Sequence, residues 1–305
     1  MNILLAGGSG FIGQALVHAL QKNHTITVLG RDAKSLLREF LQPIKIATWD
    51  TLSALDANIY DVVINLCGSN IAASRWSDNV KQQLIDSRVN TSSRLTDWII
   101  KQAAKPRFIC ANAVGIYGMQ ENGDMALFDE DSLIDFDRPH DFISKIGVCW
   151  QQALQPAIDY GLNVITLRFG VVLKKGQGML KKLSPSFYMG LGSIVGDGLQ
   201  VISWVHIDDV IGAVLFLLGK PEFTGAFNIT SPNPVTQAEF SRTLATAMHR
   251  PLLLKTPGFI IRALFGEMGD CLLLKGQRVL PKRLNESGYI FSHPVLSDAL
   301  SHEFG

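Results

Sequence analysis

The chain has 305 residues, 47% of them hydrophobic, and its 28 lysines and arginines are matched by 27 acidic residues. This length allows one large domain or two ordinary ones. The net formal charge of +1 excludes the strong positive field that attracts nucleic-acid backbones and anionic membrane surfaces. The sequence therefore predicts a small-molecule partner, with no nucleic acid and no membrane.

The cysteines lie far apart in the sequence. They are Cys67, Cys110, Cys149 and Cys271. None has the short paired spacing of a zinc site or a redox pair. We therefore expect free thiols in a reducing cytoplasm, and no metal site.

Two apolar segments test the membrane alternatives directly. The opening segment, residues 2–20, lacks a basic n-region and contains Gly-Gly-Ser-Gly in its middle, which argues against a signal peptide. The run from Val210 to Gly219 is about half of the ~20 residues that cross a bilayer. It predicts a buried helix instead.

The first elements of the chain predict a strand, a tight turn and a helix. Ile3 to Ala6 are uniformly apolar, as in a strand covered on both faces, and from Phe11 to Leu20 apolar residues recur at helical spacing. A second apolar run, Thr25 to Leu29, follows about 20 residues after the first. This is the repeat length of a parallel βαβ unit.

The same alternation continues along the chain. Further strands are predicted at Ile44–Ala47, Asp61–Leu66, Arg107–Cys110, Val164–Leu167 and Ala226–Ile229, and helices at Val80–Gln102, Phe142–Tyr160 and Asp208–Leu218. This pattern predicts an α/β fold with a doubly wound parallel sheet. Residues 175–202 show little periodicity and are expected to form a loop or a small excursion, and the remainder short helices separated by prolines.

Three glycines follow the first strand at three-residue spacing. Gly7 would permit the sharp turn, Gly10 a close approach of the backbone to a ligand, and Gly13 tight contact between helix and strand. The helix that begins near Gly10 would then direct free N–H groups at a pyrophosphate. An ordinary packing turn is the alternative, but the strand-turn-helix context favours dinucleotide binding.

The end of the second strand bears on which dinucleotide binds. The sequence there is VLGRD, so Arg31 stands at the tip, where an acidic residue would suit NAD. A guanidinium can donate two hydrogen bonds to the 2′-phosphate of NADP. We therefore expect NADP (NADPH), with NAD less favoured and with Ser9 and Lys34 as helpers. The alternative is a solvated Arg31 beside Asp32.

Several longer motifs are similar to those of a known family. They are GGSGFIG, DVVINLCGSNIAASRW with DSRV downstream, ANAVGIYG, LRFGVVL, SWVHIDD, and a tail with RPLLLKTPGF, FGEMGD and GQRVLPKRL. Together they resemble the atypical extended short-chain dehydrogenase/reductases, specifically the NAD(P)-dependent sugar-nucleotide epimerase-like proteins with a C-terminal domain of unknown function. The likeness covers nearly the whole chain.

The resemblance implies a Rossmann-type NAD(P)-binding domain in residues 1–174 and 203–232. A smaller, mainly helical substrate-side portion would comprise residues 175–202 and 233–305. By position, residues 66–68 would line the adenosine side of the cofactor and residues 169–173 would border the nicotinamide. The full cofactor-binding set is Gly7, Ser9, Gly10, Phe11, Ile12, Gly13, Arg31, Leu66, Cys67, Gly68, Lys145, Phe169, Gly170, Val171 and Val172. The alternative for Cys67 and its neighbours is that they only form part of the apolar core at the end of a strand.

Ordinary relatives in this family use a Tyr and a Lys four residues later, with a Ser on a neighbouring strand end. The Lys lowers the pKa of the phenol, which exchanges a proton with the substrate hydroxyl. The matching segment here is DFISK, which keeps Lys145 but has Asp141 at the Tyr position. The Ser position falls on Ala113, or on Asn112 in the alignment of the subgroup. Two of the three catalytic groups are therefore missing.

Four residues remain as candidates for the chemistry. Lys145 could hold the nicotinamide ribose. Asp141 could act as general acid or base, or simply pair with Lys145. Tyr117 could supply a replacement phenol, or form an aromatic wall beside the cofactor. Asn112 could orient a substrate oxygen, but it cannot exchange a proton.

Four more residues are expected on the substrate side. Arg75 and Trp76 could contact a polar or phosphorylated substrate, or lie in an exposed loop. Trp204 and His206 could lie near the substrate, or hold the sheet edge as structural residues. The acidic pair 208–209 is expected to cap the following helix.

Two functions fit these features. One is an NADP-dependent oxidoreductase or epimerase acting on a hydroxyl or carbonyl of a small polar substrate, such as a nucleotide sugar, with an unusual proton donor. The other is a protein that binds NADP(H) without turnover, as a sensor or scaffold. The helices at 80–102 and 142–160 are where such relatives commonly form homodimers.

Overall fold

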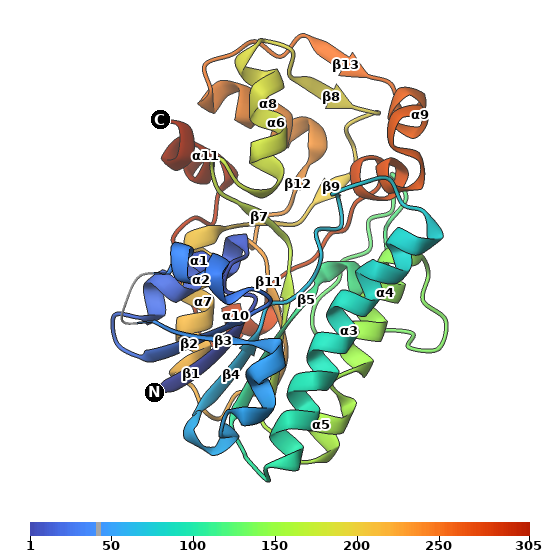
Figure 1. Cartoon of the computed structure of the whole chain (residues 1–305). Coiled ribbons are helices and arrows are strands. Elements are labelled where there is room, and N and C mark those ends of the chain that lie inside the picture. The colour runs from blue at the N-terminus through green and yellow to red at the C-terminus, as the bar shows by residue number, and fades with distance from the viewer. Residues whose placement is uncertain (41–43) are drawn as a thin grey trace.

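A seven-stranded parallel sheet forms the centre of the computed structural model, which describes residues 1–40 and 44–305 (Figure 1). In spatial order its strands are β11 (Gly225–Ile229), β6 (Val164–Phe169), β5 (Arg107–Ala113), β4 (Val62–Asn65), β1 (Asn2–Ala6), β2 (Thr25–Gly30) and β3 (Lys45–Thr48). The order reverses between β1 and β4, which is the topological switch point where such sheets bind ligands. The predicted doubly wound Rossmann-type fold is confirmed.

Helices cover both faces of this sheet (Figure 1). On one side lie α1 (Phe11–Leu20), α2 (Ala33–Glu39) and α7 (Ile207–Leu218), and on the other α3 (Asp78–Lys101), α4 (Phe142–Gln152) and α5 (Gln155–Asp159). Each face has its own apolar core, for example Leu5 with Leu16 on one face and Leu4 with Leu95 on the other, all fully buried. Burial on both faces explains why the strands are continuous apolar runs.

Two helical predictions need correction. The helix expected from Phe142 to Tyr160 is divided into α4 and α5, because Leu154 N donates to Gln151 O in the tighter i→i−3 pattern and Pro156 has no N–H with which to continue the helical bonds. The segment expected as a loop after Lys174 contains α6 (Gly178–Tyr188), which is helical despite Pro185 in its interior. Leu180 and Phe187 anchor this helix in a third apolar cluster.

Short strands and helices form a second part of the molecule, above the sheet in Figure 1. The strands pair two by two: β10 (Trp204–His206) with β7 (Val171–Leu173), β12 (Val235–Thr236) with β9 (Val201–Ile202), and β13 (Leu254–Thr256) with β8 (Ser193–Val195). The further helices of this part are α8 (Gln237–Ala247), α9 (Gly258–Gly269) and α11 (Leu296–Phe304), whereas α10 (Lys282–Glu286) lies beside β11 of the central sheet. Short 3-10 or π turns occur at Trp49–Ala54, Ala57–Ile59, Val114–Tyr117 and Asp270–Leu274. The division of the chain into an NAD(P)-binding domain and a substrate-side portion, with boundaries at residues 174, 203 and 232, stays a prediction.

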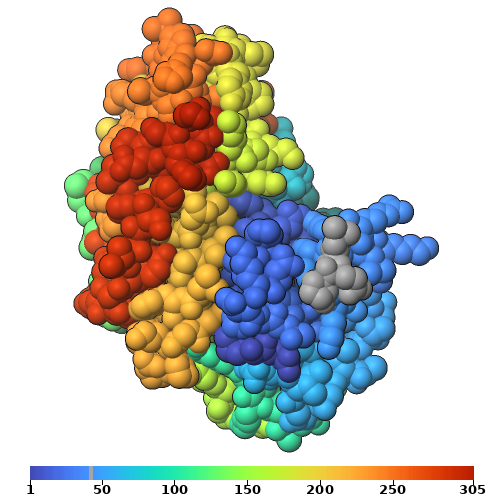
Figure 2. Space-filling model, turned by 90° about the vertical axis from the view of Figure 1, so that its left-hand side faces the viewer, coloured from blue at the N-terminus to red at the C-terminus, as the bar shows by residue number. Residues whose placement is uncertain are grey.

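The C-terminal segment returns to the Rossmann half of the molecule. In the turned view of Figure 2 the red end of the chain lies against the gold α7 segment and the yellow-green residues near α6. Within residues 1–40 and 44–305, every helix is too short or too polar to cross a membrane.

Candidate cofactor and active site

The glycine turn joins β1 to α1 at the carboxyl edge of the sheet. Gly7 has a φ of +83°, a conformation that side-chain-bearing residues rarely adopt, and its N–H donates to Leu29 O on the neighbouring strand. Gly10 is the N-cap of α1 and no side chain caps that helix end. The first N–H groups of α1 are therefore available to an anion.

The turn is too tight for any residue but glycine at two of the three positions. A Cβ on Gly13 would lie 2.3 Å from Gly7 O, and one on Gly7 would lie 2.8 Å from the carbonyl carbon of Leu66. At Gly10 the nearest atom would be Gly7 O at 3.3 Å, with no other neighbour within 4 Å in the described chain. Gly7 and Gly13 thus make the turn, whereas Gly10 leaves open space beside it.

Arg31 and Asp32 follow β2 and have different surroundings. The Asp32 carboxylate caps α2 by accepting hydrogen bonds from the N–H groups of Lys34, at 3.2 Å, and Ser35, at 3.1 Å. Arg31 is exposed and makes no hydrogen bond or ion pair with residues 1–40 or 44–305. The acidic side chain is therefore occupied, and the guanidinium can bind a ligand.

Residues at the end of β4 pack against the turn. The backbone of Leu66 and Cys67 packs against Gly7, and the Cys67 N–H donates to Asn65 Oδ1 at 3.1 Å. Burial raises the pKa of the Cys67 thiol to about 12, and Arg31 is close enough to oppose this shift. The Arg31 guanidinium and the glycine turn thus lie at the same edge of the sheet.

Other predicted cofactor contacts lie near the same turn. The Phe11 ring and Val172 O both come within 4 Å of the Cβ position of Gly178, at the start of α6. Gly170 packs against Ser203 O, where a Cβ would lie 2.5 Å from that oxygen. Ser9 and Gly68 are exposed, while Ile12, Phe169 and Val171 are half-buried. The structure brings these segments together around the N-terminus of α1.

Tyr117 is buried, with 4% of its surface exposed. Its hydroxyl donates to Asn228 Oδ1 at 2.9 Å and accepts from Arg168 Nη1 at 2.8 Å, and its ring stacks on Phe128. Burial raises the pKa of Tyr117, and this outweighs the opposite effect of Arg168. Such a phenol releases its proton reluctantly, which argues against a role as the replacement proton donor.

Asp141 is the N-cap of α4. Its Oδ1 accepts from Ser144 N and its Oδ2 from Met119 N, both at 2.7 Å. The pairing expected between Asp141 and Lys145 is not formed in the described chain. With both oxygens bound to backbone N–H groups, Asp141 organises the start of α4, and this argues against general acid or base catalysis.

Lys145 is exposed on α4, and its ammonium has no hydrogen bond or ion pair within the described ranges. It lines a surface cavity with residues from the start of α3, such as Asp78 and Lys81. Asn112 is 2% exposed and its Nδ2 donates to Gly147 O at 3.1 Å. Lys145 can therefore reach a ligand, whereas the Asn112 amide joins β5 to α4.

Arg75 and Trp76 lie in the loop between β4 and α3. Arg75 Nη2 donates to Ala263 O of α9 at 3.3 Å, and Trp76 Nε1 donates to Ile71 O at 2.9 Å. The same loop accepts a hydrogen bond from Lys182 of α6, through Ala72 O. Arg75 thus connects the loop to α9 and Ala72 connects it to α6, whereas Trp76 bonds within the loop.

Trp204 and His206 of β10 are both fully buried. Trp204 Nε1 donates to Asn233 O at 2.9 Å, and His206 Nε2 bonds Glu303 Oε1 at 2.9 Å. Burial lowers the pKa of His206, and this outweighs the opposite effect of Glu303. Their surroundings favour the structural alternative over contact with substrate.

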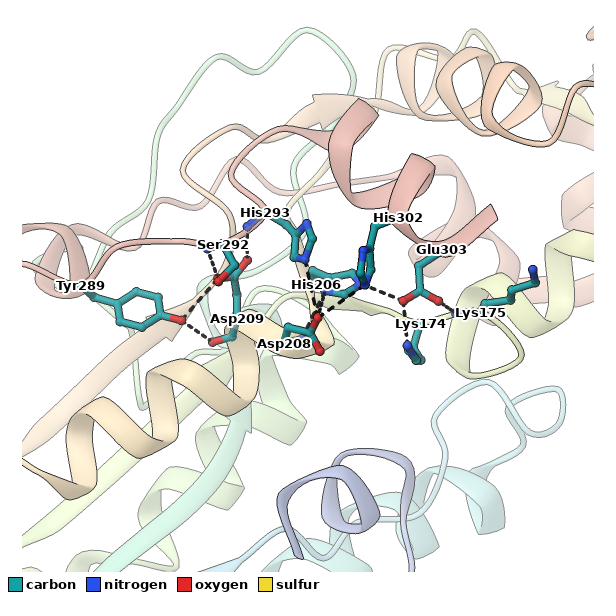
Figure 3. A network of polar contacts seen from close by, with 10 residues as sticks. All are labelled: Lys174, Lys175, His206, Asp208, Asp209, Tyr289, Ser292, His293, His302 and Glu303. Atoms are coloured by element: carbon teal, nitrogen blue, oxygen red, sulfur yellow. Dashed lines mark hydrogen bonds and ion pairs between the residues drawn. The ribbon is translucent and has the colours of Figure 1, made fainter. Parts of the chain in front are cut away.

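The acidic pair after His206 also departs from its predicted role. The N-cap of α7 is His206, whose Nδ1 accepts from Asp208 N at 3.3 Å. Asp209 is fully buried and accepts from Ser292 N at 2.6 Å and from His293 N at 2.9 Å (Figure 3). Its carboxylate therefore fixes the distant segment before α11 instead of capping its own helix.

Sequence reasoning missed two buried ionic groups. Arg168 supports Tyr117, and Glu303 accepts from His206 Nε2, Lys174 Nζ and Lys175 N. Burial alone would raise the pKa of Glu303, but these donors outweigh it and lower the pKa. The only signal in the sequence was that Arg168 interrupts an apolar strand.

A seven-stranded parallel sheet with an open glycine turn beside its switch point defines a Rossmann-type nucleotide-binding fold. Residues 3–230 match the model of the NAD dependent epimerase/dehydratase family, and residues 256–303 match a domain of unknown function, DUF1731. The chain belongs to the NAD dependent epimerase/dehydratase family. The predicted resemblance to extended short-chain dehydrogenase/reductases is thereby confirmed.

Relatives match over almost the full length of the chain. Epimerase family protein Mb2239 of Mycobacterium bovis is 36% identical over 301 residues, which cover 98% of this chain and 96% of the relative. Epimerase family protein YfhF of Bacillus subtilis is 33% identical over 303 residues, covering 99% and 97%. The crystal structure of human epimerase family protein SDR39U1 (isoform 2) with NADPH has a TM-score of 0.89 at 32% identity and covers 99% of both chains.

Proposed function

We propose that the protein binds NADP(H) at the glycine turn and acts as an epimerase- or reductase-like oxidoreductase on a hydroxyl or carbonyl of a small polar substrate. The observation that carries this proposal is the uncapped N-terminus of α1 together with the exposed Arg31 guanidinium, which has no partner among residues 1–40 and 44–305. The human relative that was crystallised with NADPH supports the choice of cofactor. The resemblance to sugar-nucleotide epimerase-like proteins favours a nucleotide sugar as the substrate class.

The residues present fit such a cofactor. Open space beside Gly10 admits a diphosphate to the N–H groups of α1, and Arg31 matches a 2′-phosphate. Leu66, Cys67 and Gly68 would line the adenosine, and Phe169 to Val172 the nicotinamide. When bound, the nicotinamide supplies or accepts hydride, and the protein supplies orientation.

Three of the four predicted catalytic residues are poor substitutes for the usual phenol. Tyr117, Asp141 and Asn112 all use their polar atoms within the protein. Lys145 is the predicted catalytic residue whose side chain stays available, and we assign its Nζ to the nicotinamide ribose or the substrate oxygen. The proton of the reaction would then be exchanged with water.

Replacing the proposed 2′-phosphate ligand tests cofactor choice. We expect Arg31→Ala to weaken NADPH binding by roughly tenfold to hundredfold and to leave NADH binding nearly unchanged, because a charge-assisted hydrogen bond contributes about 1.5–3 kcal/mol. Isothermal titration calorimetry with both nucleotides measures this. Arg38→Ala, which removes the same charge from the exposed last turn of α2, is the matched control. Equal losses for NADPH and NADH would contradict the assignment of Arg31.

A protein that binds NADP(H) without turnover is the second candidate. The buried hydroxyl of Tyr117 and the fully bound carboxylate of Asp141 favour it, since an enzyme of this family would be expected to hold a proton donor ready. Fold and cofactor site are common to both functions and do not separate them.

A turnover assay separates the two candidates. Purified protein is given NADPH and a panel of carbonyl compounds, including nucleotide sugars, and NADPH absorbance is followed. For an enzyme, we expect Lys145→Ala to lower kcat by about tenfold or more, while Lys101→Ala, an exposed lysine at the end of α3, has no effect. Absence of turnover despite tight NADPH binding would favour the sensor or scaffold, and turnover unaffected by Lys145→Ala would remove Lys145 from the site.

The remaining sequence predictions stay part of this proposal. They are a homodimer formed through the exposed faces of α3 and of α4 with α5, and a cytoplasmic location.

A further inference from the structure

Three histidines and an aspartate converge where the C-terminal segment meets α7 (Figure 3). His206 ends β10 and Asp208 lies in the first turn of α7, whereas His293 precedes α11 and His302 lies in its last turn. One ligand atom from each side chain lies within 4.8 Å of all the others. Nothing in the proposed cofactor site uses these side chains.

The spacing of their atoms fits a tetrahedral metal site. Asp208 Oδ2 is 3.5 Å from His206 Nδ1, 3.6 Å from His293 Nε2 and 3.8 Å from His302 Nε2. Ligands bound to zinc at about 2.0–2.2 Å in a tetrahedron are roughly 3.4 Å apart. Small side-chain rotations would bring all four atoms to that spacing around one ion.

A buried carboxylate prepares His206 to be a ligand. Glu303 Oε1 bonds His206 Nε2 at 2.9 Å, and Glu303 is itself held by Lys174 Nζ at 2.9 Å and Lys175 N at 2.6 Å. A proton held on Nε2 leaves Nδ1 unprotonated, 3.5 Å from Asp208 Oδ2, and an ion bound there would replace the long hydrogen bond that Nδ1 accepts from Asp208 N at 3.3 Å. Carboxylates orient metal-binding histidines in this way.

Access from solvent is also available. The side chain of His206 is fully buried and that of His293 is 15% exposed, but those of Asp208 and His302 are 49% and 54% exposed. An ion could therefore enter from the open side, losing its water as the four ligands bind. Three imidazoles and one carboxylate form a donor set typical of zinc and other first-row divalent transition metals.

We propose that His206, Asp208, His293 and His302 bind one divalent transition metal ion, best matched by Zn²⁺. The ion joins α11 and the segment before it to the start of α7, and so fastens the C-terminal helix to the Rossmann half. Sequence spacing could not indicate this site, because residues 206 and 302 meet only in the folded chain.

Metal binding is tested on the full-length chain without a histidine tag. The chelator-treated protein is dialysed against Zn²⁺ and analysed for metal content, with a second sample titrated with Co²⁺ and followed by visible absorption. We expect one zinc ion per chain, the intense absorption of tetrahedral Co²⁺, and a thermal midpoint that rises with zinc. Mg²⁺, which prefers oxygen ligands, should produce none of these changes.

Two exposed ligands provide variants that keep the fold. We expect His302→Ala and Asp208→Asn each to weaken zinc binding by about tenfold or more, because each removes one of four ligands. His18→Ala is the matched control, since His18 is likewise an exposed histidine in the last turn of a helix. Circular dichroism confirms that each variant is folded.

Three outcomes would overturn the proposal. They are a wild-type chain that takes up no zinc at micromolar concentrations, zinc uptake that His302→Ala and Asp208→Asn leave unchanged, and a bound Co²⁺ spectrum that is octahedral. The first would leave the histidines as a packed aromatic cluster beside Asp208.

Discussion

Gly10→Val is expected to abolish NADPH binding and leave the protein folded. Among the described residues, a Cβ at residue 10 meets only Gly7 O, at 3.3 Å, and the extended backbone of Gly10 (φ −76°, ψ 167°) suits valine. The added methyl groups would occupy the space through which a diphosphate reaches the N–H groups of α1. We expect a loss of roughly hundredfold or more in NADPH affinity, or about 2.7 kcal/mol, measured by calorimetry.

Two further glycine variants serve as comparisons. Gly219→Ala, at the end of α7, places a Cβ no closer than 3.5 Å to any atom in the described chain, and it should change neither binding nor stability. Gly13→Ala places a Cβ 2.3 Å from Gly7 O and should lower the thermal midpoint as well as binding. If Gly10→Val bound NADPH as tightly as the wild type, the turn would not be the cofactor site.

Asp209→Ala is expected to cause the largest loss of stability. The fully buried carboxylate accepts from Ser292 N and His293 N and lies 3.3 Å from the Tyr289 hydroxyl. Truncation would remove the charged acceptor of the Ser292 and His293 N–H groups, at about 1.5–3 kcal/mol for each hydrogen bond to a charged group, while the Tyr289 hydroxyl keeps Asp209 O as an acceptor at 3.1 Å. We therefore expect urea unfolding to show a loss of about 3 kcal/mol or more in the free energy of unfolding.

A surface aspartate provides the control for this variant. Asp298 lies in the first turn of α11 and is exposed, so Asp298→Ala should cost about 1 kcal/mol at most. Asp209→Asn should fall between the two, because its amide keeps one oxygen acceptor and replaces the other with a donor. A loss below about 1 kcal/mol for Asp209→Ala would show that water can replace the carboxylate at this position.

The sheet was predictable because its strands are buried on both faces. All seven apolar runs proposed from the sequence became strands of the central sheet, within a few residues of their expected ends. The glycine turn was predictable for a similar reason. Backbone atoms lie so close to Gly7 and Gly13 that a side chain at either position would have no room. Local sequence determines these features, and a reader of the sequence can therefore find them.

The polar contacts of the site were much less predictable. Asp141 and Lys145 have the spacing of a helical ion pair, yet Asp141 begins its helix and turns to backbone N–H groups that include Met119 N. His206 and Glu303 are 97 residues apart. Such contacts depend on where folding brings distant segments, and no spacing rule describes them.

In the described chain, three polar contacts tie the loop between β4 and α3, and the first turn of α3, to the upper part of the molecule. They are the Arg75 bond to Ala263 O, the Lys182 bond to Ala72 O, and the ion pair between Lys81 and Glu267 at 2.6 Å. The ion pair is partly exposed to water, so it contributes about 1 kcal/mol or less and salt screens it. The electrostatic attraction between the start of α3 and the end of α9 therefore weakens as ionic strength rises.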